Sequence, residues 1–256
     1  MLRWFEHSQV YHPYREMTAT GAELGRPYED VYFEAGDGVR LNGWFFPANT
    51  HSPRRHLAVV YCHGNGGNIC HRLPPCESLL TTGVNVFLFD YRGYGRSAGR
   101  PSEEGTYLDA QAAYDWLRGK GFAGTNLIAF GESLGGGVAA ELAVRVPLGG
   151  LVLMSTFTSI PAMAADLFPW LPFRGLGVIR YDTVSKLPRV RVPVLILHSP
   201  ADGLVRFRHA EANYAAANEP KLLWRIAGDH NNPLEDGRAF TEGVERFLTM
   251  LEGRGR

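Results

Sequence analysis

Residues 127–144 read LIAFGESLGGGVAAELAV, and this stretch decides the fold. The apolar residues 127–130 predict a short buried strand, and the apolar spacing after residue 137 predicts a helix. Between them, Ser133 is flanked by Gly131 and Gly135, which are small enough for a sharp turn from strand to helix. Such a turn would project the Ser133 hydroxyl from the edge of a sheet. The competing interpretation is a glycine-rich helix start in which Ser133 is only the N-cap.

The composition indicates one globular domain over residues 1–256. Of the 256 residues, 45% are hydrophobic and 20% are charged, which is enough for a single well-packed core. The 26 basic and 26 acidic residues give a formal net charge of zero. Neither sign forms long blocks, so we expect no nucleic-acid partner and no anionic membrane surface as partner. A small uncharged molecule is the expected ligand, and the oligomeric state stays open.

The N-terminal segment carries no recognisable targeting signal. No apolar run is long enough to cross a bilayer, and MLRWFEHSQVYHPYREM lacks the basic and then apolar order of a secretion signal. We therefore expect a soluble cytoplasmic protein with no membrane anchor in this chain. Two interpretations of Trp4, Phe5, Val10 and Tyr11 stay open: the remnant of a removed anchor, or a segment that packs on the domain.

Cysteine and histidine spacing indicates neither disulfides nor a metal. Cys62, Cys70 and Cys76 cannot all pair, and a domain of this size needs no disulfide, so reduced thiols are expected. His63 and His71 lie next to the first two cysteines, but the spacing matches no tetrahedral zinc pattern. We expect no metal and no cofactor.

Apolar patterns predict an α/β fold. Alternation in residues 28–35 and 40–46, separated by Gly36-Asp37-Gly38, predicts an antiparallel hairpin. Continuous apolar runs, which are typical of strands buried on both faces, follow at 57–62, 85–89, 127–130, 151–154, 194–198 and 222–226. Helical spacing occurs at 69–81, 105–118, 134–146, 207–217 and 238–251. This order predicts a mostly parallel, doubly wound sheet of about eight strands that begins with the antiparallel hairpin.

Residues 157–188 interrupt the alternation with a long segment rich in proline and aromatic residues. An apolar insertion of this length is usually functional, so we interpret it as a small cap over the carboxyl edge of the sheet. Its candidates for a substrate pocket are Ile160, Met163, Phe168, Trp170, Leu171 and Phe173. The alternative is that these side chains only pack the cap onto the core.

Serine is a weak nucleophile near neutral pH and needs a base, which in turn needs an orienting acid. Among the histidines after Ser133, His198 ends a predicted strand and His209 lies in a predicted helix. His230 instead lies in the loop after the last strand, at the expected catalytic edge, so it is the predicted base. Because a histidine base has to be neutral, kcat/KM should rise with pH around an apparent pKa of about 6 to 7.

The predicted acid is Asp202, in the turn after the strand 194–198. It completes the chain order Ser, Asp, His, with each residue at a strand end. Asp229 is the rival next to the histidine, although sequence neighbours rarely face each other as a side-chain pair. Asp182, in the cap, is a further alternative.

A tetrahedral intermediate requires two backbone donors for its oxyanion. The amide of Leu134, directly after the serine, is the first candidate. The second is the amide of Asn65, in the HG loop, which we define as residues 63–68 with the sequence HGNGGN. A phosphate-binding interpretation of this loop lacks the Lys and Ser/Thr of a P-loop and the spacing of a dinucleotide fingerprint.

Five segments together resemble the Bem46-like serine hydrolases of the α/β-hydrolase superfamily: DGVRLNGWFFP, CHGNGGN, FDYRGYGRSAGRPSEEGTYLDAQAAYDWL, GESLGGGVA and GDHNNP. The resemblance covers nearly the whole chain and implies the α/β-hydrolase fold. It also implies a triad of Ser133, Asp202 and His230, an oxyanion donor at Asn65, and a structural role for residues 90–97. Ser199 departs from the glycine that is common in the family, and the N-terminal membrane anchor of many members is missing.

These residues predict a serine carboxylesterase that cleaves short to medium acyl esters through an acyl-enzyme. No charged specificity pocket or second domain for gripping a peptide is apparent, and a small apolar cap suits an acyl chain. An acyl-thioesterase or a monoacylglycerol lipase would use the same triad. A non-catalytic binding protein on the same scaffold is the alternative from a different class. Epoxide hydrolases and dehalogenases are disfavoured because their relatives have Asp in place of Ser133.

Overall fold

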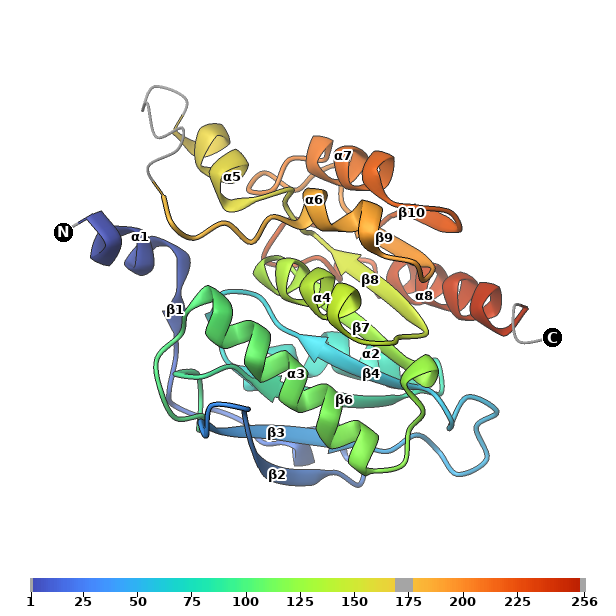
Figure 1. The fold of residues 1–256 in the computed structure, drawn as a ribbon. Helices are drawn as coiled ribbons and strands as arrows, with labels where there is room; N and C mark the ends of the chain where they lie inside the picture. Colours follow the sequence, from blue (N-terminus) through green and yellow to red (C-terminus); the bar gives the residue numbers. More distant parts are fainter. Residues whose placement is uncertain (1, 169–176, 254–256) are drawn as a thin grey trace.

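The computed structural model describes residues 2–168 and 177–253. Its centre is an eight-stranded sheet with the order β10-β9-β8-β7-β4-β6-β3-β2 (Figure 1). The strands are β2 (Glu29–Glu34), β3 (Arg40–Phe46), β4 (Ala58–Cys62), β6 (Asn85–Asp90), β7 (Leu127–Glu132), β8 (Gly150–Met154), β9 (Val194–His198) and β10 (Lys221–Arg225). β3 runs antiparallel to both of its neighbours, and all other pairs are parallel. The predicted fold class is confirmed.

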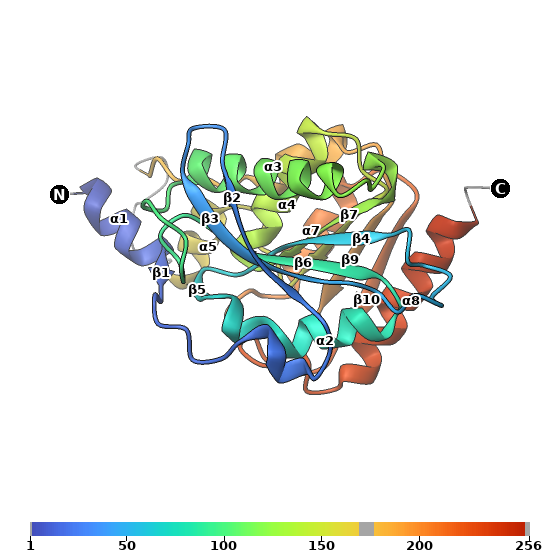
Figure 2. The ribbon, with the colours of Figure 1, turned by 90° about the horizontal axis from the view of Figure 1, so that it is seen from below.

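Helices cover both faces of the sheet (Figure 2). One face carries α2 (Leu73–Thr81) and α8 (Gly237–Glu252). The other carries α3 (Glu103–Gly119), α4 (Leu134–Arg145) and α7 (Arg208–Ala216). This arrangement is expected when consecutive parallel strands are joined by right-handed helical crossovers.

Strand β7 shows why the runs in the middle of the sheet are continuously apolar. Leu127 and Ala129 belong to the hydrophobic cluster on one face of the sheet, and Ile128 and Phe130 belong to the cluster on the other face. Successive side chains of a strand point to opposite faces, so both sets must be apolar when both faces are covered. The four side chains are almost completely buried.

The N-terminal segment packs on the domain. Helix α1 (Leu2–Val10) leads into the two-residue strand β1 (His12–Pro13), which pairs with β5 (Gly66–Gly67). Val10 and Tyr11 are buried, and the Tyr11 hydroxyl lies 2.9 Å from that of Tyr181. Across the two described ranges, no helix has both the length and the apolar character needed to cross a membrane.

The insertion at residues 157–188 contains α5 (Ile160–Leu167) and the short α6 (Thr183–Lys186). Ile160 and Met163 are half-buried and pack against the core, whereas Phe168 is exposed. Trp170, Leu171 and Phe173 lie outside the described residues. The assignment of these side chains to a substrate pocket stays a prediction.

The remaining short helical turns are η1 (Gly21–Leu24), η2 (Ile69–Arg72), η3 (Gly124–Asn126) and η4 (Leu187–Arg189). Of these turns, η2 continues directly from the HG loop into α2, so the loop ends where η2 begins.

The three cysteines are buried and form no disulfide.

Candidate active site

Ser133 lies on the turn between β7 and α4 in a conformation that is rare for a residue with a side chain. Its φ is 52° and its ψ is −114°. The backbone is held on both sides, because the Ser133 N–H donates to the Met154 carbonyl at 2.9 Å and its carbonyl accepts from Gly136 N–H at 3.0 Å. The Ser133 side chain makes no capping hydrogen bond to α4. The hydroxyl is therefore available for another partner, as the sharp-turn interpretation requires.

The glycines around Ser133 are needed for close packing of backbone on backbone. A Cβ at Gly135 would lie 2.0 Å from the carbonyl oxygen of Cys62, on the neighbouring strand β4. A Cβ at Gly131 would lie 2.4 Å from the Gly135 carbonyl oxygen. Because real Cβ atoms do not approach so closely, any larger residue would push the start of α4 away from the sheet.

Three side chains from three strand ends form a continuous hydrogen-bonded chain. Ser133 Oγ lies 3.0 Å from His230 Nε2, and His230 Nδ1 lies 2.8 Å from Asp202 Oδ2. The other Asp202 oxygen accepts from the backbone N–H groups of Leu204 at 3.0 Å and Val205 at 2.8 Å. Asp202 thus fixes the tautomer in which Nδ1 carries the proton and Nε2 accepts the serine proton.

The surroundings keep Asp202 ionised. Burial alone would raise the pKa of Asp202, but the hydrogen bond from His230, the charge of that ring and the Val205 amide together hold this pKa below its usual value. An ionised carboxylate is the form that can accept from His230 and stabilise an imidazolium during proton transfer.

We expect Asp202 to stabilise the fold at neutral pH and to lose this contribution in acid. Its pKa is lower in the folded chain than the value of about 3.9 in an unfolded chain, so the folded state binds this proton less tightly. Urea unfolding of the wild type and Asp202→Asn should give a free-energy difference that shrinks as the pH falls below about 4, where the Asp202 carboxylate takes up its proton. A difference that is equal in acid and at neutral pH would contradict this expectation.

The rival carboxylates have other partners. Asp229 Oδ1 accepts from the backbone N–H groups of Asn231 at 2.8 Å and Asn232 at 2.9 Å, so it closes the loop that carries the histidine. Asp182 caps α6 by accepting from Ser185 N–H at 3.2 Å. Neither makes the contact to His230 that Asp202 makes.

In the part of the chain that the structure describes, neither rival histidine is hydrogen-bonded to Ser133, although His198 Nε2 lies 3.6 Å from Asp202 Oδ2. His198 Nε2 lies 2.7 Å from the Val205 carbonyl, and burial lowers the pKa of His198. His209 lies 3.0 Å from Thr158 Oγ1 through Nδ1 and 3.0 Å from Asp166 Oδ2 through Nε2. It therefore joins α7 to α5 in the insertion rather than facing the serine.

In the HG loop, Asn65 is held through its carbonyl and its side chain. The Asn65 carbonyl accepts from His12 N–H at 3.2 Å and from the Tyr94 hydroxyl at 2.8 Å, and its side-chain amide donates to the Val10 carbonyl at 3.1 Å. Among the described residues, no group accepts from the backbone N–H of Asn65. This geometry is compatible with an oxyanion donor, and the assignment of Asn65 and Leu134 to that role stays a prediction.

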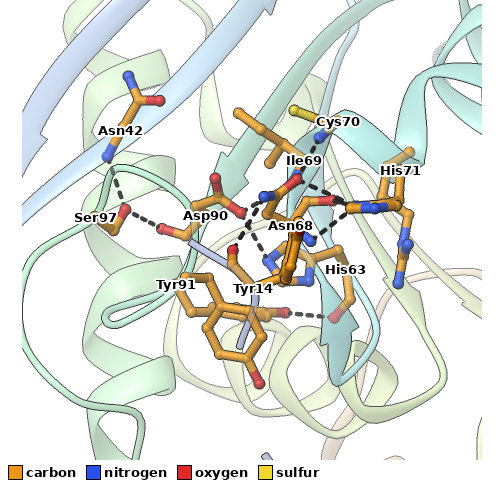
Figure 3. Close-up of polar contacts among 12 residues, drawn as sticks. Tyr14, Asn42, His63, Asn68, Ile69, Cys70, His71, Asp90, Tyr91 and Ser97 are labelled. Atoms are coloured by element: carbon orange, nitrogen blue, oxygen red, sulfur yellow. Dashed lines mark hydrogen bonds and ion pairs between the residues drawn. The ribbon is translucent and has the colours of Figure 1, made fainter. Parts of the chain in front are cut away.

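Beneath the HG loop lies a buried polar network (Figure 3). His63 Nε2 and Asp90 Oδ1 are 3.5 Å apart and fully buried, and Asp90 also accepts from Ile69 N–H at 3.0 Å. Tyr91 donates to the His63 carbonyl, and Ser97 donates to the Asp90 carbonyl. Burial raises the pKa of Asp90, while His63 opposes the shift. These contacts connect the segment 90–97 to the backbone of the HG loop.

A cavity of about 880 Å³ opens beside Ser133 and His230. Its other side chains include His12, Tyr14, Thr18, His71, Arg72 and Glu132. None of these six residues is among the site residues that the sequence predicts. For the N-terminal residues, the two-residue pairing of β1 with β5 is too short to leave a periodic signal in the sequence. Arg72 and Glu132 could have been suspected from their positions, shortly after the HG loop and directly before Ser133.

Comparisons with known proteins agree with this architecture. The family model described as serine aminopeptidase, S33, matches residues 53–179. The uncharacterized protein Rv2307c of Mycobacterium tuberculosis is 40% identical over 253 residues, which cover 97% of this chain and 89% of that protein. The α/β-hydrolase domain-containing protein WAV2 of Arabidopsis thaliana is 36% identical and covers 86% of this chain and 79% of its own length.

One further sequence relative and one solved structure are also similar to this chain. The protein Bem46 of Schizosaccharomyces pombe is 32% identical over 75% of this chain and 66% of its own length. The esterase Pf2001 of Pyrococcus furiosus superposes with a TM-score of 0.77, covering 95% of this chain and 98% of that structure at 22% identity. On the sequence relatives and the shared fold together, the chain belongs to the Bem46-like proteins of the α/β-hydrolase superfamily.

Proposed function

We propose that this protein is a serine carboxylesterase that cleaves short to medium acyl esters. The hydrogen-bonded chain from Ser133 through His230 to Asp202, on a strained turn beside an 880 Å³ cavity, is the observation that supports this proposal most strongly. A serine hydroxyl next to a neutral histidine with a fixed tautomer is the arrangement that acyl transfer needs.

The reaction proceeds in two balanced halves. Ser133 Oγ attacks the ester carbonyl as its proton passes to His230 Nε2, and the same proton then goes to the departing alcohol. Water attacks the resulting acyl-enzyme, giving its proton to His230, and the acid leaves as Ser133 recovers its hydrogen. The amides of Asn65 and Leu134 donate to the oxyanion in both halves.

The name of the matching family model raises an aminopeptidase as a rival. An aminopeptidase must bind the free α-amino group of its substrate, for which a carboxylate is the natural partner. Glu132 is the acidic side chain that lines the described cavity, and it is already paired with Arg72 at 2.8 Å. This pairing favours an ester over a peptide with a free N-terminus.

The test is hydrolysis of p-nitrophenyl esters from acetate to dodecanoate, with thioesters of the same acyl chains in parallel. We expect the preferred ester to reach a kcat/KM of about 10⁴ M⁻¹ s⁻¹ or more. A serine-directed phosphonate probe should label Ser133, with mass spectrometry locating the adduct.

The other outcomes separate the alternatives. Faster cleavage of thioesters would indicate an acyl-thioesterase, and a strong preference for monoacylglycerols would indicate a monoacylglycerol lipase. Absence of both hydrolysis and labelling in folded protein would indicate a non-catalytic binding protein instead.

A further inference from the structure

Arg72 makes contacts at the base of the cavity that the triad mechanism does not use. It ends η2, directly after the HG loop, and its guanidinium folds back so that Nη2 donates to the Gly66 carbonyl at 2.9 Å. The Nε of the same group forms an ion pair with Glu132 Oε2 at 2.8 Å. Glu132 is the last residue of β7 and immediately precedes Ser133. One side chain therefore touches both the HG loop and the turn that carries the serine.

The ion pair is largely buried, yet both residues line the cavity. The Arg72 and Glu132 side chains are only 14% and 15% exposed. Tyr61 donates a further hydrogen bond to Glu132 Oε2 at 2.9 Å. Burial would lower the pKa of Arg72, but the charge and contact of Glu132, together with other neighbouring groups, raise this pKa above its ordinary value. Two groups from separate elements, Tyr61 of β4 and Arg72 of η2, thus hold one carboxylate in place.

Gly64 shows how close this ion pair lies to the reacting serine. A Cβ built on Gly64 would be 3.3 Å from Arg72 Nη2, 3.4 Å from Glu132 Oε1 and 3.6 Å from Ser133 Cβ. The loop backbone, both charged groups and the nucleophile therefore share one small volume. A negative charge that develops on a substrate oxygen here would lie close to the Glu132 carboxylate and to the guanidinium that balances it.

We propose that Arg72 is a positioning residue that joins the two segments carrying the oxyanion donors and neutralises Glu132 beside them. This inference rests on the proposed serine mechanism. Asn65 belongs to the HG loop and Leu134 to the turn after Ser133, so their amides converge only if the two segments keep a fixed separation. Loss of Arg72 would release the Gly66 carbonyl and leave the Glu132 carboxylate without its counter-charge, close to the forming anion.

The test compares Arg72→Met, Arg72→Lys, Glu132→Gln and the double variant Arg72→Met/Glu132→Gln. Arg72→Met should lower kcat about 100-fold to 1000-fold, as loss of an oxyanion donor does, with KM changed less than about threefold. The double variant should recover about tenfold of this loss, because its carboxylate is gone. Arg72→Lys keeps the positive charge but cannot contact the Gly66 carbonyl and Glu132 at the same time, so its kcat should lie between those of the wild type and Arg72→Met.

The matched control is Arg54→Met. Arg54 is 12% exposed and forms an ion pair with Glu252 at 2.6 Å, but it precedes β4, at the edge of the sheet opposite the serine. This variant should lose stability in a thermal melt and keep the kcat of the wild type. A fall in kcat equal to that of Arg72→Met would mean that the loss reflects general destabilisation, and it would overturn the proposal.

The rate of phosphonate labelling at Ser133 is measured on all variants, because it reports the site without requiring an ester substrate. Arg72→Met should label at least about tenfold more slowly than the wild type, since the adduct also places an oxygen in the oxyanion site. If the wild type is labelled but cleaves no ester, the proposed substrate is wrong while the Arg72 comparison still holds. Equal labelling of wild type and Arg72→Lys would overturn the positioning role, even if Arg72→Met failed to fold.

Discussion

Replacement of Ser133 by alanine is expected to lower kcat/KM about a million-fold, which is the typical cost of removing a serine nucleophile from a triad. The substitution deletes only Oγ, and with it the 3.0 Å contact to His230. The backbone hydrogen bonds of residue 133 to Met154 and Gly136 do not involve the side chain. Alanine retains a Cβ, so the positive φ of 52° is no more strained than it is for serine.

Ester hydrolysis by the wild type and by Ser133→Ala measures this effect, with circular dichroism and a thermal melt as controls for the fold. Labelling by the phosphonate probe should disappear together with the activity. If the variant kept more than about 1% of the wild-type activity, another group would be the nucleophile and the proposed mechanism would be wrong.

The sheet could be predicted from the sequence because each strand carries its own local signal, either a continuous apolar run or an alternation of apolar and polar residues. Residues 127–130 and 194–197 are continuously apolar, and the structure shows strands there that are buried on both faces. The hairpin was predictable because two segments of alternating residues flank Gly36-Asp37-Gly38, and a short glycine-containing turn between such segments is typical of antiparallel strands. Such signals depend on neighbours in sequence.

The relative position of the candidate triad followed from topology. The carboxyl ends of parallel strands meet at one edge of the sheet, so residues just after β7, β9 and β10 must lie near each other. The structure places Ser133, Asp202 and His230 there and joins them through hydrogen bonds on the two sides of the His230 ring. The order of the three residues in the sequence and their positions after predicted strands were sufficient to choose them over the other histidines and aspartates.

The cavity walls could not be predicted in the same way. The strand β1 pairs with β5 across more than fifty residues of sequence, and each partner is only two residues long. The pair of Arg72 with Glu132 joins the end of η2 to the end of β7. Charged residues at both positions are equally compatible with a solvated surface, so only the packed fold shows that they meet.

Asp202→Asn is expected to lower kcat about 10⁴-fold, whereas Asp229→Asn should change it less than about threefold. In the first variant, the oxygen of the new side-chain amide could still accept from the backbone N–H groups of Leu204 and Val205, but its NH₂ group would then face His230 Nδ1. Such a contact favours the tautomer with the proton on Nε2, which cannot accept the proton of Ser133.

Asp229→Asn is the matched control because Asp229 lies next to His230 in the sequence but, unlike Asp202, does not accept a hydrogen bond from its ring. Asp229 adjoins His230 in sequence, yet its oxygen accepts from the amides of Asn231 and Asn232, and the oxygen of an asparagine would accept from them equally well. The two variants are compared by ester hydrolysis at neutral pH, with thermal melts for folding. Equal losses would show that the charge near His230 matters rather than the orientation of its ring. A large loss confined to Asp229→Asn would transfer the role of the acid to that residue, against the 2.8 Å contact that His230 makes with Asp202.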